Sequence, residues 1–464
     1  TDYSIGIHAK DSIVTNTGNI KTGSDGIAFV TDNSILNLNS GNLEVLSGSL
    51  VYGKNNSIIN YNLGDKVITG VNPYVNIENS TLNLLSPTKL SVSDNGVGIF
   101  VFGNTGVITG DLTLDLNSNA LGIYVKDLGT AFINNSIINV NGVSSSGIIS
   151  ENSDIINTGT IKVNGNNGAG ILSELTNAGT SNMITNTGNI SVSNDNGIGI
   201  YATAKDSTGV LLGNTTINNN GNINLGSTTD INTKAQIGIY GSDSIDINNN
   251  TNINGGEKVI GIYSKGSNVT TNGSINVGNS SVAVYLEGGN LTTSGSSVIS
   301  TGDLNGVGIY ASNGAQIINN SSNITAGKSS VLVYGKDSGT LITNNAILSI
   351  GELSTGFYID SSKVNNLASL NASGSNAVFF YGKNGEIENN GTLNALGNKG
   401  LIAIYGENSK ITNNGNINLN DSVINFLDST KNNYSVGIYG ENYIINNTYQ
   451  ISIGENGVGI YSNN

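Results

Sequence analysis

The stretch ITNTGNISVSNDNGIGIY, from Ile184 to Tyr201, decides the fold of this chain. Ile190 and Val192 alternate with polar residues, as do Ile198 and Ile200, so each pair is expected to lie on one face of a β-strand. The segments NTGN and NDNG between the apolar stretches predict turns, because Asn and Gly tolerate positive φ and Asn side chains hydrogen-bond nearby backbone. The stretch therefore indicates a unit of short strands joined by tight turns.

A tetrapeptide close to Val-Gly-Ile-Tyr ends this stretch and returns about every 24 residues along the chain. From Tyr240 to Tyr405, successive copies are 23, 22, 25, 24, 24, 23 and 24 residues apart. A period this short cannot hold a separate domain, so each copy is expected to be one supersecondary unit stacked on its neighbours. The last residue of each copy, usually tyrosine, falls at His8, Ala28, Tyr52, Phe100, Tyr124, Ile149, Leu172, Tyr201, Tyr240, Tyr263, Tyr285, Tyr310, Tyr334, Tyr358, Tyr381, Tyr405, Tyr439 and Tyr461.

The repeat predicts an all-β fold, a right-handed parallel β-helix. Identical sequences stack like on like when each repeat forms one turn of a coil, which suits parallel strands, and parallel connections are almost always right-handed. Asn residues at equivalent turn positions are then expected to form ladders of amide hydrogen bonds. We expect about 19 turns of roughly 24 residues with three strands each, giving a length on the order of 90 Å at the ~4.8 Å spacing of paired strands.

The repeat also decides the expected domain organisation. A length of 464 residues would ordinarily indicate several globular domains, but copies of the repeat extend from end to end. We therefore expect residues 1–464 to form one continuous β-helix, and because both ends lie inside a copy, to be a segment of a longer protein. Insertions or irregular turns are expected near residues 53–96, 202–235 and 421–435, where the copies are further apart.

The insertions are candidate binding elements, because solenoid proteins often contact partners through loops that leave the coil. The candidate loops are residues 202–212, 227–235 and 421–434. Tolerated drift without a ligand is the simpler interpretation of all three.

Composition and charge exclude several classes of function. The formal net charge is -14, only 11% of residues are charged, and the chain has no arginine. Nucleic-acid binding is not expected, because it needs a basic and preferably arginine-bearing surface. The absence of cysteine excludes disulfides and thiolate metal sites. No apolar run is long enough to predict a transmembrane helix.

The sequence contains no recognisable catalytic constellation. His8 is the only histidine, and we interpret it as a substitute for the repeating tyrosine. Carboxylates lie close together in three pairs, which are Asp111 with Asp115, Asp243 with Asp246, and Glu386 with Glu388. Asp111 and Asp115 would share a strand face and could bind a cation weakly, but a solvated face is the favoured interpretation. We expect no enzymatic activity, no cofactor and no metal site.

The tyrosine column is the main candidate binding surface. The alternation in Ile198–Tyr201 predicts that the first and third residues point inward, and that the Gly or Ala and the Tyr point outward. Stacked over many turns, this predicts a ridge of tyrosine rings beside a furrow floored by Gly and Ala. Such rings shield the backbone, and they also suit a sugar face or a protein partner. The candidate ligand-binding residues are Tyr240, Tyr263, Tyr285, Tyr310, Tyr334 and Tyr358.

Charged residues of both signs follow the tyrosines, as in Gly53-Lys54 and Leu286-Glu287, and we interpret them as a solubilising corner.

The repeats resemble the passenger domains of very large type V autotransporter adhesins. The segments that carry the resemblance are ITNTGNI at 184–190, VGIY at 307–310 and ITNNGNI at 411–417. The Asn-rich, Arg-free composition is most similar to that of the fusobacterial outer-membrane adhesins of the RadD kind. The resemblance covers essentially the whole chain. It implies a secreted β-helical passenger on the bacterial cell surface, anchored in the outer membrane by a C-terminal β-barrel absent from this chain, and it supplies no catalytic residues.

The leading hypothesis is therefore a monomeric adhesin, and so a virulence factor, that binds a host-cell receptor or glycan, or the surface of another bacterium. A polysaccharide-processing β-helix enzyme is the second hypothesis, because such enzymes place Asp clusters on one outer face. The lack of arginine counts against a lyase of that kind. An inert stalk that projects a distal binding tip is the third.

Overall fold

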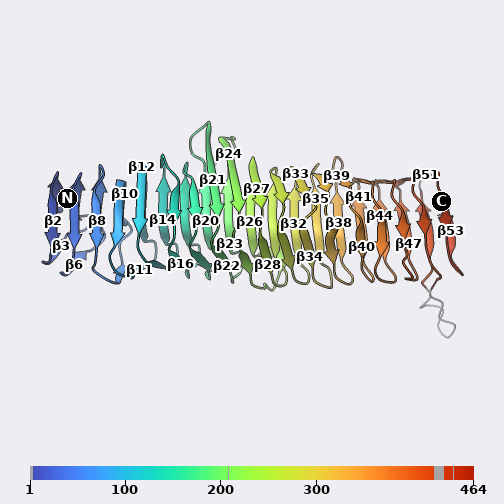
Figure 1. Cartoon of the computed structure of the whole chain (residues 1–464), viewed down its shortest axis with the longest axis horizontal. Helices are drawn as coiled ribbons and strands as arrows, with labels where there is room; N and C mark the ends of the chain where they lie inside the picture. Colours follow the sequence, from blue (N-terminus) through green and yellow to red (C-terminus); the bar gives the residue numbers. More distant parts are fainter. Residues whose placement is uncertain (1–3, 207, 423–432, 443, 464) are drawn as a thin grey trace. The chain divides into compact units, whose positions relative to one another are not determined.

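The computed structural model describes residues 4–206, 208–422, 433–442 and 444–463. The chain is a parallel β-solenoid of about 19 turns of about 24 residues, with about 1% helix (Figure 1). The all-β parallel helix predicted from the repeat is thus confirmed. Within the described residues, no helix is long and apolar enough to span a membrane.

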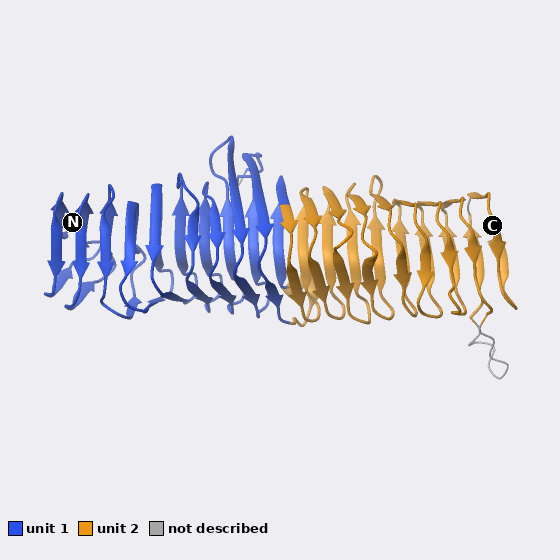
Figure 2. Ribbon diagram, in the orientation of Figure 1, with its two compact units in different colours: residues 1–226, 236–246 blue, residues 227–235, 247–464 orange. Residues whose placement is uncertain are grey.

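The chain divides into two compact units, which Figure 2 colours separately. Unit 1 holds residues 1–226 and 236–246, and unit 2 holds residues 227–235 and 247–464. In both units a typical turn has three strands. The first strand carries the Val-Gly-Ile-Tyr copy, and a second and a third strand follow it.

The described residues of unit 1 contain ten first strands. These are β1 (Ile5–Lys10), β4 (Ile27–Asp32), β7 (Ser49–Lys54), β10 (Pro73–Leu84), β12 (Val97–Thr109), β14 (Leu121–Lys126), β17 (Ser146–Glu151), β20 (Ala169–Glu174), β23 (Ile198–Thr203) and β26 (Ile237–Ser242). Its second strands are β2 (Ile13–Asn16), β5 (Ile35–Leu38), β8 (Ile58–Tyr61), β15 (Phe132–Asn134), β18 (Ile155–Asn157), β21 (Thr180–Asn186) and β24 (Gly213–Asn219). Its third strands are β3 (Ile20–Thr22), β6 (Leu43–Val45), β9 (Lys66–Ile68), β11 (Thr88–Val92), β13 (Leu112–Leu116), β16 (Ile137–Val140), β19 (Thr160–Val163), β22 (Asn189–Val192) and β25 (Ile223–Leu225).

In the part of unit 2 that the structure describes there are nine first strands. These are β29 (Ile260–Lys265), β32 (Val282–Glu287), β35 (Val307–Ser312), β38 (Val331–Lys336), β41 (Thr355–Asp360), β44 (Val378–Lys383), β47 (Ile402–Glu407), β50 (Val436–Glu441) and β53 (Val458–Asn463). Its second strands are β27 (Ile245–Asn249, which lies mostly in unit 2), β30 (Asn268–Thr271), β33 (Asn290–Thr293), β36 (Gln316–Asn319), β39 (Leu341–Asn344), β42 (Lys363–Asn366), β45 (Glu386–Asn389), β48 (Lys410–Asn413) and β51 (Ile444–Asn447). Its third strands are β28 (Asn252–Gly255), β31 (Ser274–Val277), β34 (Val298–Thr301), β37 (Asn323–Ala326), β40 (Leu348–Ile350), β43 (Leu370–Ala372), β46 (Leu393–Asn394), β49 (Ile417–Asn418) and β52 (Ile451–Ser452). A short helix, α1 (Ile231–Lys234), also belongs to unit 2 and is the only helix among the described residues.

Inward aliphatic side chains from all three strands fill the turns that have neighbours on both sides. In the turn that begins with β35, the buried residues are Ile309 from the first strand, Ile317 from the second and Ile324 from the third. The side chains are β-branched, which suits strands packed on a shared core. Burial of these side chains in successive turns is the main favourable contribution to folding.

Three positions of the first strand recur in register and are named here from Ile198–Thr203. The small position is that of Gly199 and the tyrosine position is that of Tyr201. The charged position lies two residues later, at Thr203 in this copy, and holds Lys, Glu or Asp in most other copies. Parallel pairing stacks these positions directly, as in the partners Tyr285, Tyr310 and Tyr334. In the second copy the tyrosine position belongs to Val30, which pairs with Tyr52, and not to Ala28 as expected.

The interval 53–96 holds a complete turn of normal length. Asn76 pairs with Tyr52 on one side and Phe100 on the other, so it occupies the tyrosine position of that turn. The irregularity lies at the next corner, where β10 and β12 run on without a break and their pairing register shifts between Glu78 and Ser80.

The predicted asparagine ladders are present in both units. In unit 1, Asn134 donates from Nδ2 to Oδ1 of Asn157 at 2.7 Å, and Asn157 donates in the same way to Asn186 at 2.8 Å. In unit 2, Asn344 donates to Asn366 at 2.7 Å, and further asparagines continue the row. These residues end the second strands and point inward, so the amides satisfy one another where water cannot reach them.

Candidate functional site

The six candidate tyrosines occupy tyrosine positions, and their rings form rows. In unit 2 the ring centroids of Tyr263 and Tyr285 are 4.8 Å apart, and those of Tyr285 and Tyr310 are 4.5 Å apart. Edge-on contacts follow to Tyr334 at 5.1 Å and from there to Tyr358 at 4.7 Å. All five rings are partly exposed, as expected for an outer row. The sixth residue, Tyr240, belongs to unit 1, where it stacks on Tyr201 at 5.0 Å.

The expected furrow beside the tyrosines does not exist, because the small positions point inward. Leu332 and Phe379 occupy this position in their turns, and both are fully buried. A Cβ atom added to Gly199 would meet the core side chains of Ile190 and Ile223 at 3.4 Å. The prediction assumed unbroken alternation along the strand. Instead, the small residue and the aliphatic residue after it both face the core, so Gly and Ala floor no outer groove.

Tyrosine hydroxyls meet the charged position of the following turn. Tyr263 donates to Glu287 Oε2 at 2.8 Å, and Tyr52 donates to Glu78 in the same way. Partial burial and the neighbouring Glu78 carboxylate raise the pKa of Tyr52 to about 12. The hydroxyl therefore remains a proton donor at neutral pH. The charged corner and the tyrosine row thus form one outer surface.

Two of the carboxylate pairs are split between separate contacts. Asp115 accepts hydrogen bonds from Lys89 Nζ at 2.5 Å and Asn139 Nδ2 at 2.7 Å, whereas Asp111 lies exposed before β13. Burial would raise the pKa of the Asp115 carboxyl, but the bonds from Lys89 and Asn139 hold it below the usual value. Asp243 pairs with Lys205 at 2.7 Å, and Asp246 accepts from Asn214 at 3.0 Å. Among the described residues, no three His, Asp or Glu side chains are grouped so as to hold a metal ion.

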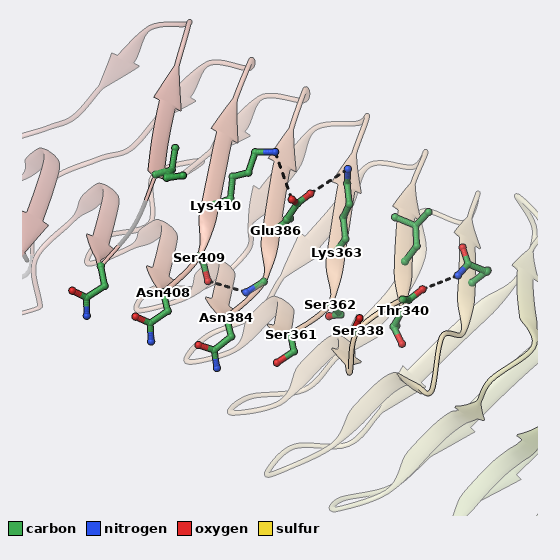
Figure 3. A pocket seen from close by; sticks show the side chains of 16 residues that line it. Ser338, Thr340, Ser361, Ser362, Lys363, Asn384, Glu386, Asn408, Ser409 and Lys410 are labelled. Atoms are coloured by element: carbon green, nitrogen blue, oxygen red, sulfur yellow. Dashed lines mark hydrogen bonds and ion pairs between the residues drawn. The ribbon is translucent and has the colours of Figure 1, made fainter.

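Of the third pair, Glu386 lines an open groove of about 720 Å³ on the second strands of unit 2, and Glu388 lies 3.8 Å from Lys363 of the same groove. Figure 3 shows Lys363 and Lys410 converging on Glu386, at 3.4 Å and 3.5 Å. All three side chains are more than two-fifths exposed. Exposed ion pairs of this kind contribute little free energy, and the groove presents charges that already neutralise one another.

The insertion predicted after β23 leaves the coil as a small hairpin. Lys205 and Leu211 pair as an antiparallel bridge. Asp206 Oδ1 accepts hydrogen bonds from the backbone N–H groups of Thr208 and Val210, both at 2.9 Å, which closes the loop. Val210 is 57% exposed and Leu211 is 53% exposed. The hairpin therefore presents two apolar side chains to solvent.

A pocket of about 640 Å³ lies beside this hairpin in unit 1. Its lining includes Tyr201 and Glu174 on the first strands, Lys205 and Asp206 on the hairpin, and Asp243. Sequence reasoning identified the loop but not the pocket. A signal was available, because the spacing from Leu172 to Tyr201 is also longer than the repeat, so two neighbouring turns carry additional residues at this corner.

The other two candidate loops show less structure among the described residues. Residues 227–235 hold α1, whose N-cap Asp230 accepts a hydrogen bond from the N–H of Asn232 at 2.9 Å. Most of the loop at 421–434 lies outside the described residues, which omit 423–432.

Comparisons with protein-family models, with curated proteins and with solved structures find no match to this chain.

Proposed function

We propose that this chain is a segment of a bacterial autotransporter adhesin, displayed outside the cell, which attaches the bacterium to host cells or to other bacteria through a protein or glycan receptor. The resemblance of its repeats to such passengers supports this function. In this proposal the β-solenoid is the scaffold, and the loops that leave it make the contacts.

The observation that carries the proposal is the hairpin between β23 and β24 with its adjoining pocket. Solenoid packing leaves little freedom to the coil, because every turn must match its neighbours. Residues beyond the turn length are free of this restraint and are the usual place for binding functions. The exposed Val210 and Leu211 give this hairpin an apolar tip of a kind that protein partners bury.

The test is adhesion of the purified chain to epithelial cells and to partner bacteria. One variant replaces Lys205–Leu211 with two glycines, and a matched control replaces Ile231–Lys234 of α1 with Gly and Ser residues. We expect wild-type chain to bind, the hairpin variant to bind about tenfold more weakly, and the control to bind like wild type. A wild-type chain that binds no cells would support the stalk alternative. Calcium-dependent depolymerisation of an acidic polysaccharide, lost in Asp115→Asn, would support the enzyme.

A further inference from the structure

The tyrosine row of unit 1 is interrupted at two successive turns. The register of the first strands aligns Tyr124, Ile149, Leu172 and Tyr201. Tyr124 stacks on Phe100 at 5.0 Å on one side, and Tyr201 stacks on Tyr240 at 5.0 Å on the other. Each of these two rings therefore faces a shorter aliphatic side chain across its remaining face. We call the gap between Tyr124 and Tyr201 the notch; it spans three strand spacings, or roughly 14 Å.

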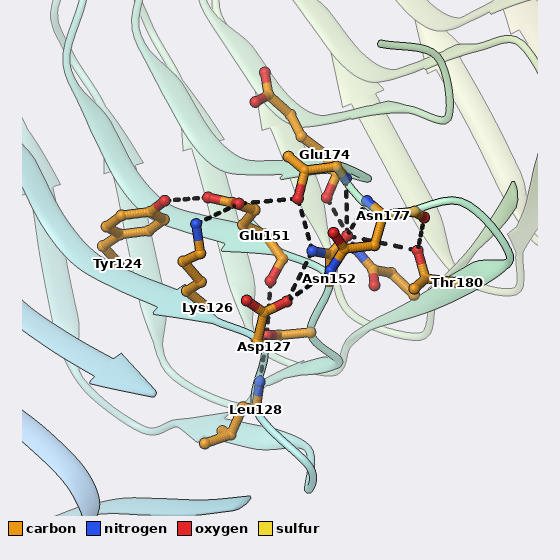
Figure 4. A network of polar contacts seen from close by, with 12 residues as sticks. Tyr124, Lys126, Asp127, Leu128, Glu151, Asn152, Glu174, Asn177 and Thr180 are labelled. Carbon is orange, nitrogen blue, oxygen red and sulfur yellow. Dashed lines mark hydrogen bonds and ion pairs between the residues drawn. The ribbon is translucent and has the colours of Figure 1, made fainter. Parts of the chain in front are cut away.

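The charged position in the notch holds two acids with different surroundings (Figure 4). Glu151 is fully engaged, because Tyr124 donates to it, Lys126 lies 2.7 Å away and Thr176 Oγ1 donates at 2.9 Å. Glu174 is the residue in register with Glu151 one turn later. The preceding turn has Ile149 at the tyrosine position and Glu151 at the charged position, so it offers the Glu174 carboxylate neither a phenol nor a lysine.

Glu174 consequently has a carboxylate without a partner among the described residues, at the wall of the pocket. Although part of its side chain is exposed, shielding by neighbouring chain segments and the charge of Glu151 raise the pKa of the Glu174 carboxyl. A carboxylate in such a place gains stability from any hydroxyl that donates to it.

The remaining pocket wall provides a flat ring and further hydrogen-bonding groups. Tyr201, Thr176 and Thr203 line it on the solenoid side, and the Lys205–Asp243 ion pair closes it at 2.7 Å. Ligand sites commonly join an apolar face to a few fixed polar groups in this way. The volume of about 640 Å³ is ample for one or two sugar rings.

We propose that the notch and its pocket bind a neutral sugar residue, whose ring face stacks on Tyr201 and whose hydroxyls donate to Glu174. A pyranose has an apolar face made of C–H groups and a rim of hydroxyls, which matches an aromatic ring beside an unpaired acceptor. Glu174, Asp206 and Asp243 against one lysine make the lining acidic, so acidic sugars are repelled. The inference rests on the proposed adhesive function and names the chemistry of its receptor.

The experiment measures binding of simple glycosides to the full chain by saturation-transfer NMR. The neutral probes are the methyl β-glycosides of galactose, glucose and N-acetylglucosamine, with sialyllactose as the acidic comparison. The test variants are Tyr201→Leu, which copies Leu172, and Glu174→Gln. The matched controls are Tyr405→Leu, in a part of the row where rings cover both faces, and Glu407→Gln. Circular dichroism establishes that each variant keeps its strand content.

We expect at least one neutral glycoside to bind, both test variants to weaken it by about tenfold or more, and both controls to leave it unchanged. The inference is overturned if no neutral glycoside binds, or if the test variants bind the glycoside as tightly as wild type does. Tighter binding of sialyllactose than of the neutral glycosides also overturns it. Displacement of the sugar by butylammonium does so too, because the acidic pocket would then be a site for a cation. If the chain adheres to cells without binding any of the neutral glycosides, only the sugar site fails. If it binds them but adheres to no cells, only the adhesive function fails.

Discussion

Asn389 shows what a single residue contributes to this fold. It is fully buried at the end of β45, where it accepts from Asn366 at 2.7 Å and donates to Asn413 at 2.8 Å and to the Gly391 carbonyl at 2.8 Å. A leucine would fill the space but would leave its neighbours' polar atoms unsatisfied. Buried amides are tolerated here because each turn supplies the partner that the next requires.

Replacing this residue tests the ladder directly. We expect Asn389→Ala to lower the free energy of unfolding by about 1–3 kcal/mol, because it leaves polar atoms of both neighbouring asparagines unpaired. Urea unfolding followed by circular dichroism measures the change. Asn418→Ala is the control, because among the described residues the exposed Asn418 side chain makes one hydrogen bond, to Asn394 Oδ1 at 3.1 Å. An equal loss of unfolding free energy in the two variants would show that burial of the ladder adds nothing to its contribution to stability.

The first strand is the element in which sequence reasoning was both most and least successful. Its recurrence predicted the parallel register and the outward tyrosines. The orientation of its small position was predicted wrongly, because alternation alone cannot reveal that Ala283 and Val284 both face the core. Two residues at that position, Leu332 and Phe379, already indicate in the sequence that it faces the core, since a large apolar side chain on an open face would be costly.

The tyrosine row predicts how the element responds to alkali. Partial burial, together with nearby Glu287 and Asp360, raises the pKa values of Tyr285 and Tyr334 to about 12, from an ordinary value of 10.0. The unfolded chain therefore ionises these hydroxyls first. Their contribution to stability is complete below pH 10 and is lost as the pH rises towards 12. We expect the midpoint of thermal unfolding, followed by circular dichroism, to fall over this range.

The control is the double variant Tyr285→Phe and Tyr334→Phe, which keeps the ring contacts and removes the two ionisations. Its midpoint should fall less steeply than that of wild type between pH 10 and 12. A parallel fall in both proteins would assign the alkaline loss to other groups.

At the scale of the whole molecule, the period alone was sufficient to predict the number of turns, the three-strand layout and the insertion after β23. The candidate site could not be predicted from it. The pocket lies at the corner where two loops lengthen, beside the turns in which Ile149 and Leu172 interrupt the tyrosine row. Each change is visible in the sequence, but only the structure shows that the Glu174 carboxylate then lacks a partner among the residues it describes.

Stacking of equivalent turns predicts that whole turns are dispensable. Deleting residues 307–330 joins Gly306 to Val331 and brings β32 and β38 into the register that each now makes with β35. We expect the midpoint of thermal unfolding to stay within about 5 °C of wild type, because solenoid stability depends on neighbour contacts. Deleting only residues 307–318 removes β35 and most of β36 but leaves the third strand of that turn, and should abolish cooperative unfolding. Similar behaviour of the two deletions would contradict the stacking argument.

The buried amides also give each row a sense of direction. From Asn319 through Asn344 and Asn366 to Asn389, every side chain donates toward the later turn and accepts from the earlier one. Rotating one amide by half a turn would set nitrogen against nitrogen and oxygen against oxygen, so no member can reverse alone. A newly formed turn must adopt the orientation of the turn before it. The direction of the chain thereby fixes the direction of its side-chain hydrogen bonds. Each folded turn acts as a template for the amide orientation of the next turn.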